Sequence, residues 1–186
     1  MSGMSTTFLG GIGVAALLAA ATPADNVIPR PSGGPSLIDP ADNPVEFKGY
    51  DGAGVARFDG RFVLSGYFTY GCAFDWDGAP VTEQDLVVRI VPDSELAKRL
   101  PRWSNSGDMV IEVLRPEKLR PSIATAEHVK ALISGEVADV HGHIAVVVDG
   151  FAADFGCDYS PYYSARFVAV AEAPKAAPVQ PVPNGC

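Results

Sequence analysis

Basic residues are scarce in this sequence. Its 186 residues include 14 Lys and Arg against 22 Asp and Glu, which gives a formal net charge of −8. A protein that binds nucleic acid needs a stripe of positive charge that neutralises phosphates. The few basic side chains here are interleaved with acidic ones, so we expect no nucleic-acid partner.

Familiar catalytic and nucleotide-binding motifs are also missing. The sequence contains no G-x-S-x-G elbow, phosphate-binding glycine loop, dinucleotide fingerprint or H-E-x-x-H zinc motif. A catalytic pair of carboxylates could be picked arbitrarily from 22 acidic residues, so such a choice would carry no information. The sequence favours a non-catalytic binding or structural module over an enzyme. Its partner could be a protein, a saccharide or a small molecule.

The first 21 residues contain no charged side chain. Residues 8–21 form an apolar run that is too short to span a bilayer comfortably and has the length of a signal-peptide core. Small residues near Thr22 and Asp25 provide cleavage positions. We therefore expect a signal peptide over 1–21, a periplasmic or secreted protein, and no membrane contact after cleavage. The absence of Lys and Arg from this segment leaves a disordered leader and an uncleaved membrane tether as alternatives.

Proline divides the rest of the chain. Residues 22–45 contain six prolines and predict an extended Pro-rich linker with little packing of its own. Residues 173–186 contain four more and predict a disordered Pro-rich tail. Residues 46–172 lie between them and are long enough for one globular domain.

Alternation of apolar and polar residues dominates the globular part. It predicts a long strand over 61–70, followed by strands over 86–90, 109–113, 137–148 and 163–170. Asp93 and Thr125 are expected to cap two short helices, which end at Leu100 and Ile133. With the main helix between the third and fourth strands, this order matches a mainly β (α+β), five-stranded OB-like barrel. A β-sandwich-like α+β domain is the alternative.

Cysteine is rare, with three residues in the whole chain. Cys72 and Cys157 each follow an aromatic residue and a glycine at an expected strand end. Two cysteines of one exported domain usually pair, so we predict one disulfide, Cys72–Cys157. Neither cysteine lies in a C-x-x-C motif, which disfavours a redox-active pair. Cys186 is then the odd cysteine, either a free thiol or the cross-link of a dimer.

Aromatic residues surround both of these cysteines. If the predicted disulfide forms, the rings meet at one pole of the barrel. There, an exposed platform flanked by carboxylates would suit sugars or cationic groups. Packing around the disulfide is the structural alternative for the same rings. The predicted ligand surface comprises Tyr70, Phe74, Trp76, Tyr159 and Tyr162.

A second candidate site is the segment Asp139-Val140-His141-Gly142-His143. On a strand, Asp139, His141 and His143 project from one face. His-x-His with a nearby carboxylate can bind Zn²⁺ or Cu²⁺, so a metal-binding protein or metal-dependent enzyme is the alternative function. The plainer interpretation is a solvent-facing polar row, because the sequence identifies no further ligand. Apart from this metal, no cofactor is expected.

Overall fold

The computed structural model describes residues 24–72, 81–155, 160–174 and 179–180. The strands are β1 (Asn26–Ile28), β2 (Leu37–Asp39), β3 (Glu46–Tyr50), β4 (Ala56–Asp59), β5 (Arg61–Cys72), β6 (Leu86–Pro92), β7 (Arg102–Trp103), β8 (Ile111–Leu114), β9 (Asp139–Phe155), β10 (Pro161–Glu172) and β11 (Val179–Gln180). The helices are the 3₁₀ turn η1 (Glu83–Asp85), α1 (Ser94–Arg99), α2 (Pro116–Ile123) and α3 (Ala126–Ile133). The predicted β-rich α+β class is confirmed.

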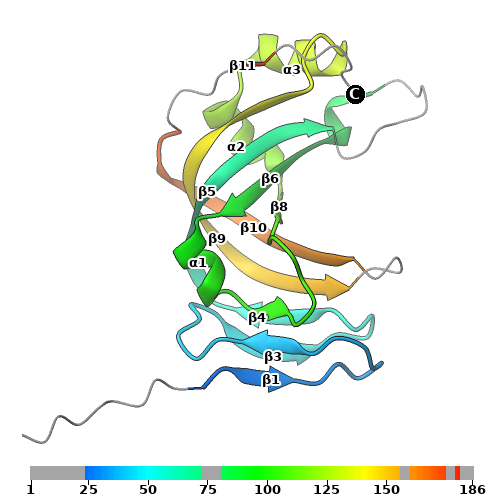
Figure 1. Cartoon of the computed structure of the whole chain (residues 1–186). Coiled ribbons are helices and arrows are strands. Elements are labelled where there is room, and N and C mark those ends of the chain that lie inside the picture. Colours follow the sequence, from blue (N-terminus) through cyan, green and yellow to red (C-terminus); the bar gives the residue numbers. More distant parts are fainter. Residues whose placement is uncertain (1–23, 73–80, 156–159, 175–178, 181–186) are drawn as a thin grey trace, which may run out of the picture.

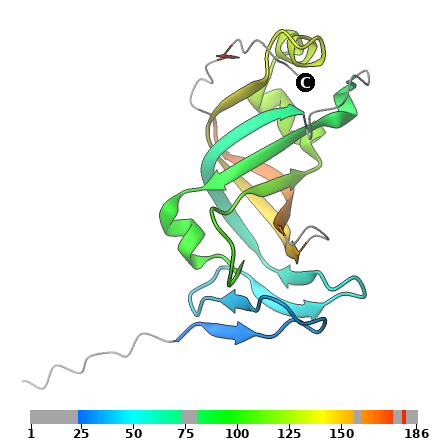
Figure 2. The ribbon, with the colours of Figure 1, turned by 45° about the vertical axis from the view of Figure 1, so that its right-hand side comes forward.

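Five strands pair in a closed ring. β5 pairs with β6, β6 with β8, β8 with β10, β10 with β9, and β9 with β5. The β8–β10 pair is parallel, and the other four pairs are antiparallel. Figure 1 shows these strongly curved strands crossing one another between α2 and α3 at one end and β1 to β4 at the other. Figure 2 shows the same arrangement from a second direction.

The predicted sheet of only five strands is wrong in extent. The large sheet has eight strands, because β3, β4 and β11 join the five strands of the ring. The physical reason is the length of β9, which spans 17 residues where the sequence predicted 12 at positions 137–148. Its far end pairs with β4 at Ala152–Ala153, and its beginning pairs with β11 at Asp139–Val140.

The alternation predicted over 61–70 is confirmed in β5 and builds the interior of the ring. Leu64 and Phe68 are fully buried, whereas Val63 and Tyr67 face outward and are exposed. Gly66 occupies the inward position between Leu64 and Phe68. A Cβ there would lie 2.1 Å from the carbonyl oxygen of Val91, so the close approach of β5 to β6 requires glycine.

The described part of the predicted Pro-rich linker, residues 24–45, is folded. It contributes β1 and β2, which form a three-stranded sheet with β7. Leu37 in β2 is fully buried and Val45 nearly so. The prolines are compatible with these strands because every one of them lies outside β1 and β2.

The helices and the tail also refine the sequence interpretation. Thr125 caps α3 as predicted, because its hydroxyl accepts a hydrogen bond from the backbone N–H of His128 at 3.2 Å. α2 was not predicted, since Pro116 and Pro121 resemble helix breakers; Pro116 instead occupies the first position of the helix.

Two residues of the tail pair with β9 as β11. In the described parts of the chain, no helix is long and apolar enough to cross a membrane.

Candidate ligand-binding face on β9, β5 and β6

Three neighbouring ring strands gather polar and aromatic residues on their outer face. Directly paired residues of antiparallel strands project to the same side of a sheet, so each outward residue of β5 is flanked by one from β9 and one from β6. The three rows are His143–Tyr67–Val91, His141–Thr69–Arg89 and Asp139–Gly71–Val87. We call these nine residues the outer site.

Tyr67 is the exposed aromatic residue of the outer site. Its side chain is 53% exposed, and its ring stacks on that of His141 with centroids 6.2 Å apart and an interplanar angle of 26°. Val63 and Val91, on the same strand and on its neighbour, are also exposed. Apolar side chains gathered in this way, rather than scattered singly, are typical of contact surfaces.

Each histidine of the outer site is hydrogen-bonded to a carboxylate. Nδ1 of His141 lies 2.8 Å from Oδ1 of Asp139 on the same strand. Nε2 of His143 lies 3.0 Å from Oδ1 of Asp93, which precedes α1. The hydroxyl of Ser65 donates to the other carboxylate oxygen of Asp93. The hydrogen bond from Ser65 and then that with His143 lower the pKa of Asp93, so this carboxylate is ionised at neutral pH.

The predicted metal ligands do not form one cluster. Asp139 and His141 lie together, but His143 is bonded to Asp93 instead. Among the described residues, no group of three or more His, Cys, Asp or Glu side chains could hold a metal ion. The physical reason is spacing: Asp139 and His143 are four residues apart on β9, roughly 13 Å along the strand, so His143 bonds to a different carboxylate. The plainer interpretation, a polar row on a strand, agrees with this geometry.

A shallow pocket of about 170 Å³ opens where the outer site contains Gly71. A Cβ on Gly71 would lie 2.7 Å from the carbonyl oxygen of Ala138, so the close approach of β5 to β9 requires glycine here too. The bare glycine leaves the floor of the pocket open between Asp139 on β9 and Arg89 on β6. The pocket therefore presents a carboxylate acceptor and a guanidinium donor. Its remaining lining residues are Thr69, Cys72, Val87 and Ala138.

The structure describes two of the five residues of the predicted ligand surface, Tyr70 and Tyr162. Tyr70 is an inward residue of β5 and only 2% exposed, so its assignment to an exposed platform is wrong. Tyr162 is exposed, but it pairs with Asp154 near the far end of β9. The other predicted residues, Phe74, Trp76, Tyr159 and Cys157, lie outside the described residues.

Sequence reasoning missed four important residues of this region. Tyr67 and Thr69 occupy outward positions of the predicted first strand, so the alternation could have found them. Arg89 and Asp93 could not have been found in the same way. They reach the site only through the pairing of β5 with β6 and through the start of α1.

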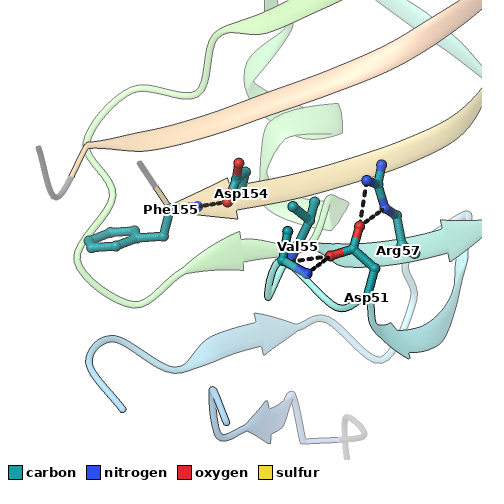
Figure 3. A network of polar contacts seen from close by, with 6 residues as sticks. Asp51, Val55, Arg57, Asp154 and Phe155 are labelled. Carbon is teal, nitrogen blue, oxygen red and sulfur yellow. Dashed lines mark hydrogen bonds and ion pairs between the residues drawn. The ribbon is translucent and has the colours of Figure 1, made fainter. Parts of the chain in front are cut away.

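A second polar cluster closes the turn between β3 and β4. The carboxylate of Asp51 accepts two hydrogen bonds from Arg57, at 2.8 and 2.6 Å, and others from the backbone N–H groups of Val55 and Ala53 (Figure 3). These bonds, first those from Arg57, lower the pKa of Asp51. Nearby, the Asp154 carboxylate accepts a hydrogen bond from the N–H of Phe155. Because the Asp51 oxygens are occupied by the turn itself, we assign this cluster a structural role.

No family model, curated protein or solved structure matches this chain.

Proposed function

We propose that this protein is a non-catalytic binding module whose outer site holds a saccharide. The observation that carries the proposal is an exposed tyrosine, Tyr67, on the same strand face as a pocket that is lined by Asp139 and Arg89. An aromatic face packs against the C–H face of a sugar ring. Carboxylate, guanidinium and hydroxyl groups in fixed positions then exchange hydrogen bonds with the sugar hydroxyls.

A binding role fits the outer site better than catalysis. The hydroxyl of Ser65 contacts one histidine–carboxylate pair, but it donates to Asp93 and not to the imidazole of His143. A serine nucleophile needs its hydroxyl hydrogen-bonded to the base that removes its proton. Asp93 lies between the two groups, so the arrangement orients His143 without activating Ser65.

We also infer that the five-strand ring is an OB-type barrel. Three observations support this assignment: the ring order β5-β6-β8-β10-β9, its single parallel pair, and the position of α2 and α3 between the third and fourth ring strands. Barrels of this type bind oligonucleotides or oligosaccharides, using the second and third strands and nearby loops. The net charge of −8 disfavours an oligonucleotide. The pocket contains Arg89 of the second ring strand and Cys72, where β5 leads into the first connection.

We further propose that the chain is exported and that residues 1–21, which lie outside the described residues, are removed. The support is the uncharged apolar run over 8–21 in the sequence. The test is the intact mass and N-terminal sequence of the protein recovered from the periplasm or the medium. A mature chain that begins at Thr22 or Asp25 is expected. A full-length chain retained in the cytoplasm would contradict the proposal.

The saccharide proposal is tested by screening the purified protein against a panel of neutral oligosaccharides. A ligand found in the screen is then titrated by calorimetry and by amide chemical shifts. We expect shifts at residues 67–71, 87–91 and 139–143, and at least tenfold weaker binding by Tyr67→Ala.

The control variant is Val27→Ala. It removes an exposed apolar side chain from β1, outside the outer site, and we expect its affinity to be unchanged. Equal binding by a folded Tyr67→Ala protein, or no binding across the panel, would overturn the proposal.

A further inference from the structure

Two cavities lie at the helical end of the ring, away from the outer site. The larger has a volume of about 600 Å³ and lies between α2 and α3, and the smaller has about 490 Å³ and lies between η1 and α2. Figure 1 shows these helices at the end of the ring opposite to β1. Both volumes are in the range of small-molecule sites in proteins, about 300–1,000 Å³. No residue of the outer site lines either cavity.

The larger cavity is an apolar groove. Ala126, Val129 and Ile133 recur on α3 at the spacing of one helix face, and all three line the groove. Pro121 and Ala124, at the end of α2, line it from the other helix. A groove with these walls suits an aliphatic or aromatic group.

The smaller cavity combines buried and polar residues. Its most buried lining residues are Tyr70 and Leu86, which are 2% and 1% exposed. The guanidinium of Arg120, on α2, donates a hydrogen bond to the Tyr70 hydroxyl. Tyr70 is an inward residue of β5, so it contributes to this cavity from the face opposite to the outer site. The buried phenol and the guanidinium give the cavity polar groups in fixed positions.

An ion pair lies where the two cavities meet. Arg120 and Glu83 line both cavities and are ion-paired with each other. Glu117 adds a second carboxylate to the smaller cavity, and Lys130 adds a second cation to the larger one. The polar cavity and the apolar groove are therefore joined by a positive and a negative side chain in direct contact.

This charge arrangement distinguishes between classes of ligand. A simple anion at Arg120 would also face the carboxylates of Glu83 and Glu117, and a simple cation would face the guanidinium. A ligand that carries both charges on neighbouring atoms avoids this repulsion. An α-amino acid is such a ligand. A guanidinium has five N–H donors, so Arg120 can hold a second carboxylate while it keeps its contact with Glu83.

We propose that the helical end of the ring binds a free apolar α-amino acid. Its carboxylate accepts hydrogen bonds from Arg120, and its ammonium group donates to Glu83 and Glu117. Its side chain lies in the groove between α2 and α3, against Val129 and Ile133. This inference does not rest on the saccharide function, because the two sites share no lining residue.

Leucine and two of its analogues test the proposed recognition of both charges. The purified full chain is titrated by calorimetry with L-leucine, with isocaproate, which lacks the amino group, and with isoamylamine, which lacks the carboxylate. We expect leucine to bind and both analogues to bind at least tenfold more weakly. Amide shifts with leucine are expected at residues 83–86, 117–120 and 126–133. No binding of leucine, or equal binding of either analogue, would overturn the proposal.

A pair of variants on α3 tests the groove. Ala126→Phe adds a ring at a residue that lines the groove, and we expect at least tenfold weaker leucine binding. Glu127→Phe is the matched control, because its neighbouring position lines neither cavity. Both positions are exposed, so both variants should fold, which urea unfolding checks. Equal leucine binding by the two folded variants would overturn the proposal.

A second pair of variants tests the guanidinium. Arg120→Gln should weaken leucine binding at least tenfold, whereas Lys118→Gln, on the same helix but outside both cavities, should leave it unchanged. Wild-type leucine affinity in a folded Arg120→Gln protein would count against the site. Saccharide binding by Ala126→Phe should equal that of the wild type, so a failure of one proposed site is distinguishable from a failure of the other.

Discussion

His143 is hydrogen-bonded to Asp93, a residue fifty positions earlier in the chain, and not to Asp139 on its own strand. This contact joins β9 to the start of α1. It also divides the histidines of the His-x-His segment between two carboxylates, since His141 bonds to Asp139. The pairing of each histidine with its own carboxylate determines how this face responds to metal ions and to acid.

Added metal ions should not stabilise the protein. The outer site presents two separate histidine–carboxylate pairs, and two side chains seldom suffice for Zn²⁺, which takes four ligands in structural sites. We expect the same melting temperature with and without stoichiometric Zn²⁺ or Cu²⁺ for the wild type and for His143→Ala. One bound ion per chain by elemental analysis, lost in His143→Ala, would contradict this interpretation.

Asp93→Asn should weaken the protein at neutral pH and matter less in acid. The folded state lowers the pKa of this carboxyl through the hydrogen bonds of Ser65 and His143. A lowered folded pKa means that the contribution is present above the unfolded value, near 3.8, and is lost as the pH falls through the folded value. Because the pair is partly exposed, we expect a loss of about 0.5–1 kcal/mol at pH 7.

Urea unfolding at pH 7 and pH 3 measures this difference between the Asp93→Asn variant and the wild type. The difference should shrink at pH 3, below the unfolded pKa, because proton uptake by the carboxyl of the unfolded wild type offsets part of its advantage over the amide. Ser65→Ala is the companion variant, since it removes the hydrogen bond that contributes most to the lowered pKa. If the difference in the free energy of unfolding between the wild type and Asp93→Asn grows toward pH 3, the stabilising role assigned to the ionised Asp93 carboxylate is refuted.

Gly66→Ala should destabilise the five-strand ring severely. The added methyl group would meet the backbone of Val91 at 2.1 Å, and a backbone atom cannot turn aside as a flexible side chain can. Overpacking of this kind costs about 1–3 kcal/mol or more. The control is Gly107→Ala, where no atom lies within 4 Å and the change should stay within about 0.5 kcal/mol. Chemical denaturation measures the free energy of unfolding of both variants. Equal values for Gly66→Ala and Gly107→Ala would contradict the described β5–β6 contact.

Leu37→Ala tests whether the segment before residue 46 is folded. Leu37 is fully buried, so its truncation should cost about 2–5 kcal/mol in the free energy of unfolding. Val27→Ala is the control in the same segment, because Val27 is 65% exposed and its loss should have almost no effect. If both variants match the wild type in thermal and urea unfolding, residues 24–45 form a linker after all.

Local patterns in the sequence located the five ring strands and the start of α3. Strict alternation identified β5, and the Thr125 hydroxyl marked the start of α3 because its hydrogen bond is made within one turn. Proline gave the wrong expectation for the described residues 24–45, since composition does not show that each proline lies outside β1 and β2. Pro121 hid α2 for a similar reason.

Contacts between distant strands were beyond such local reasoning. Nothing near His143 in the sequence indicates that Asp93 will approach it, and nothing near Cys72 indicates which strand end lies beside it. Those relationships depend on the register of β9 against β5, which spans Asp149 to Asp139. A shift of one residue would turn Tyr67 and Thr69 into the interior and Phe68 and Tyr70 outward.

The parallel pair of β8 with β10 also constrains how the protein can assemble. Residues 111–114 obtain their last hydrogen-bonding neighbour only from residues 163–166, so the ring closes only after the C-terminal part of the chain is present. Until then, β8 and β9 each have an unpaired edge that could recruit another chain. Nascent or C-terminally truncated chains that end before β10 should therefore lack the closed ring and be prone to aggregation. The ring can be completed only after β10 has been synthesised.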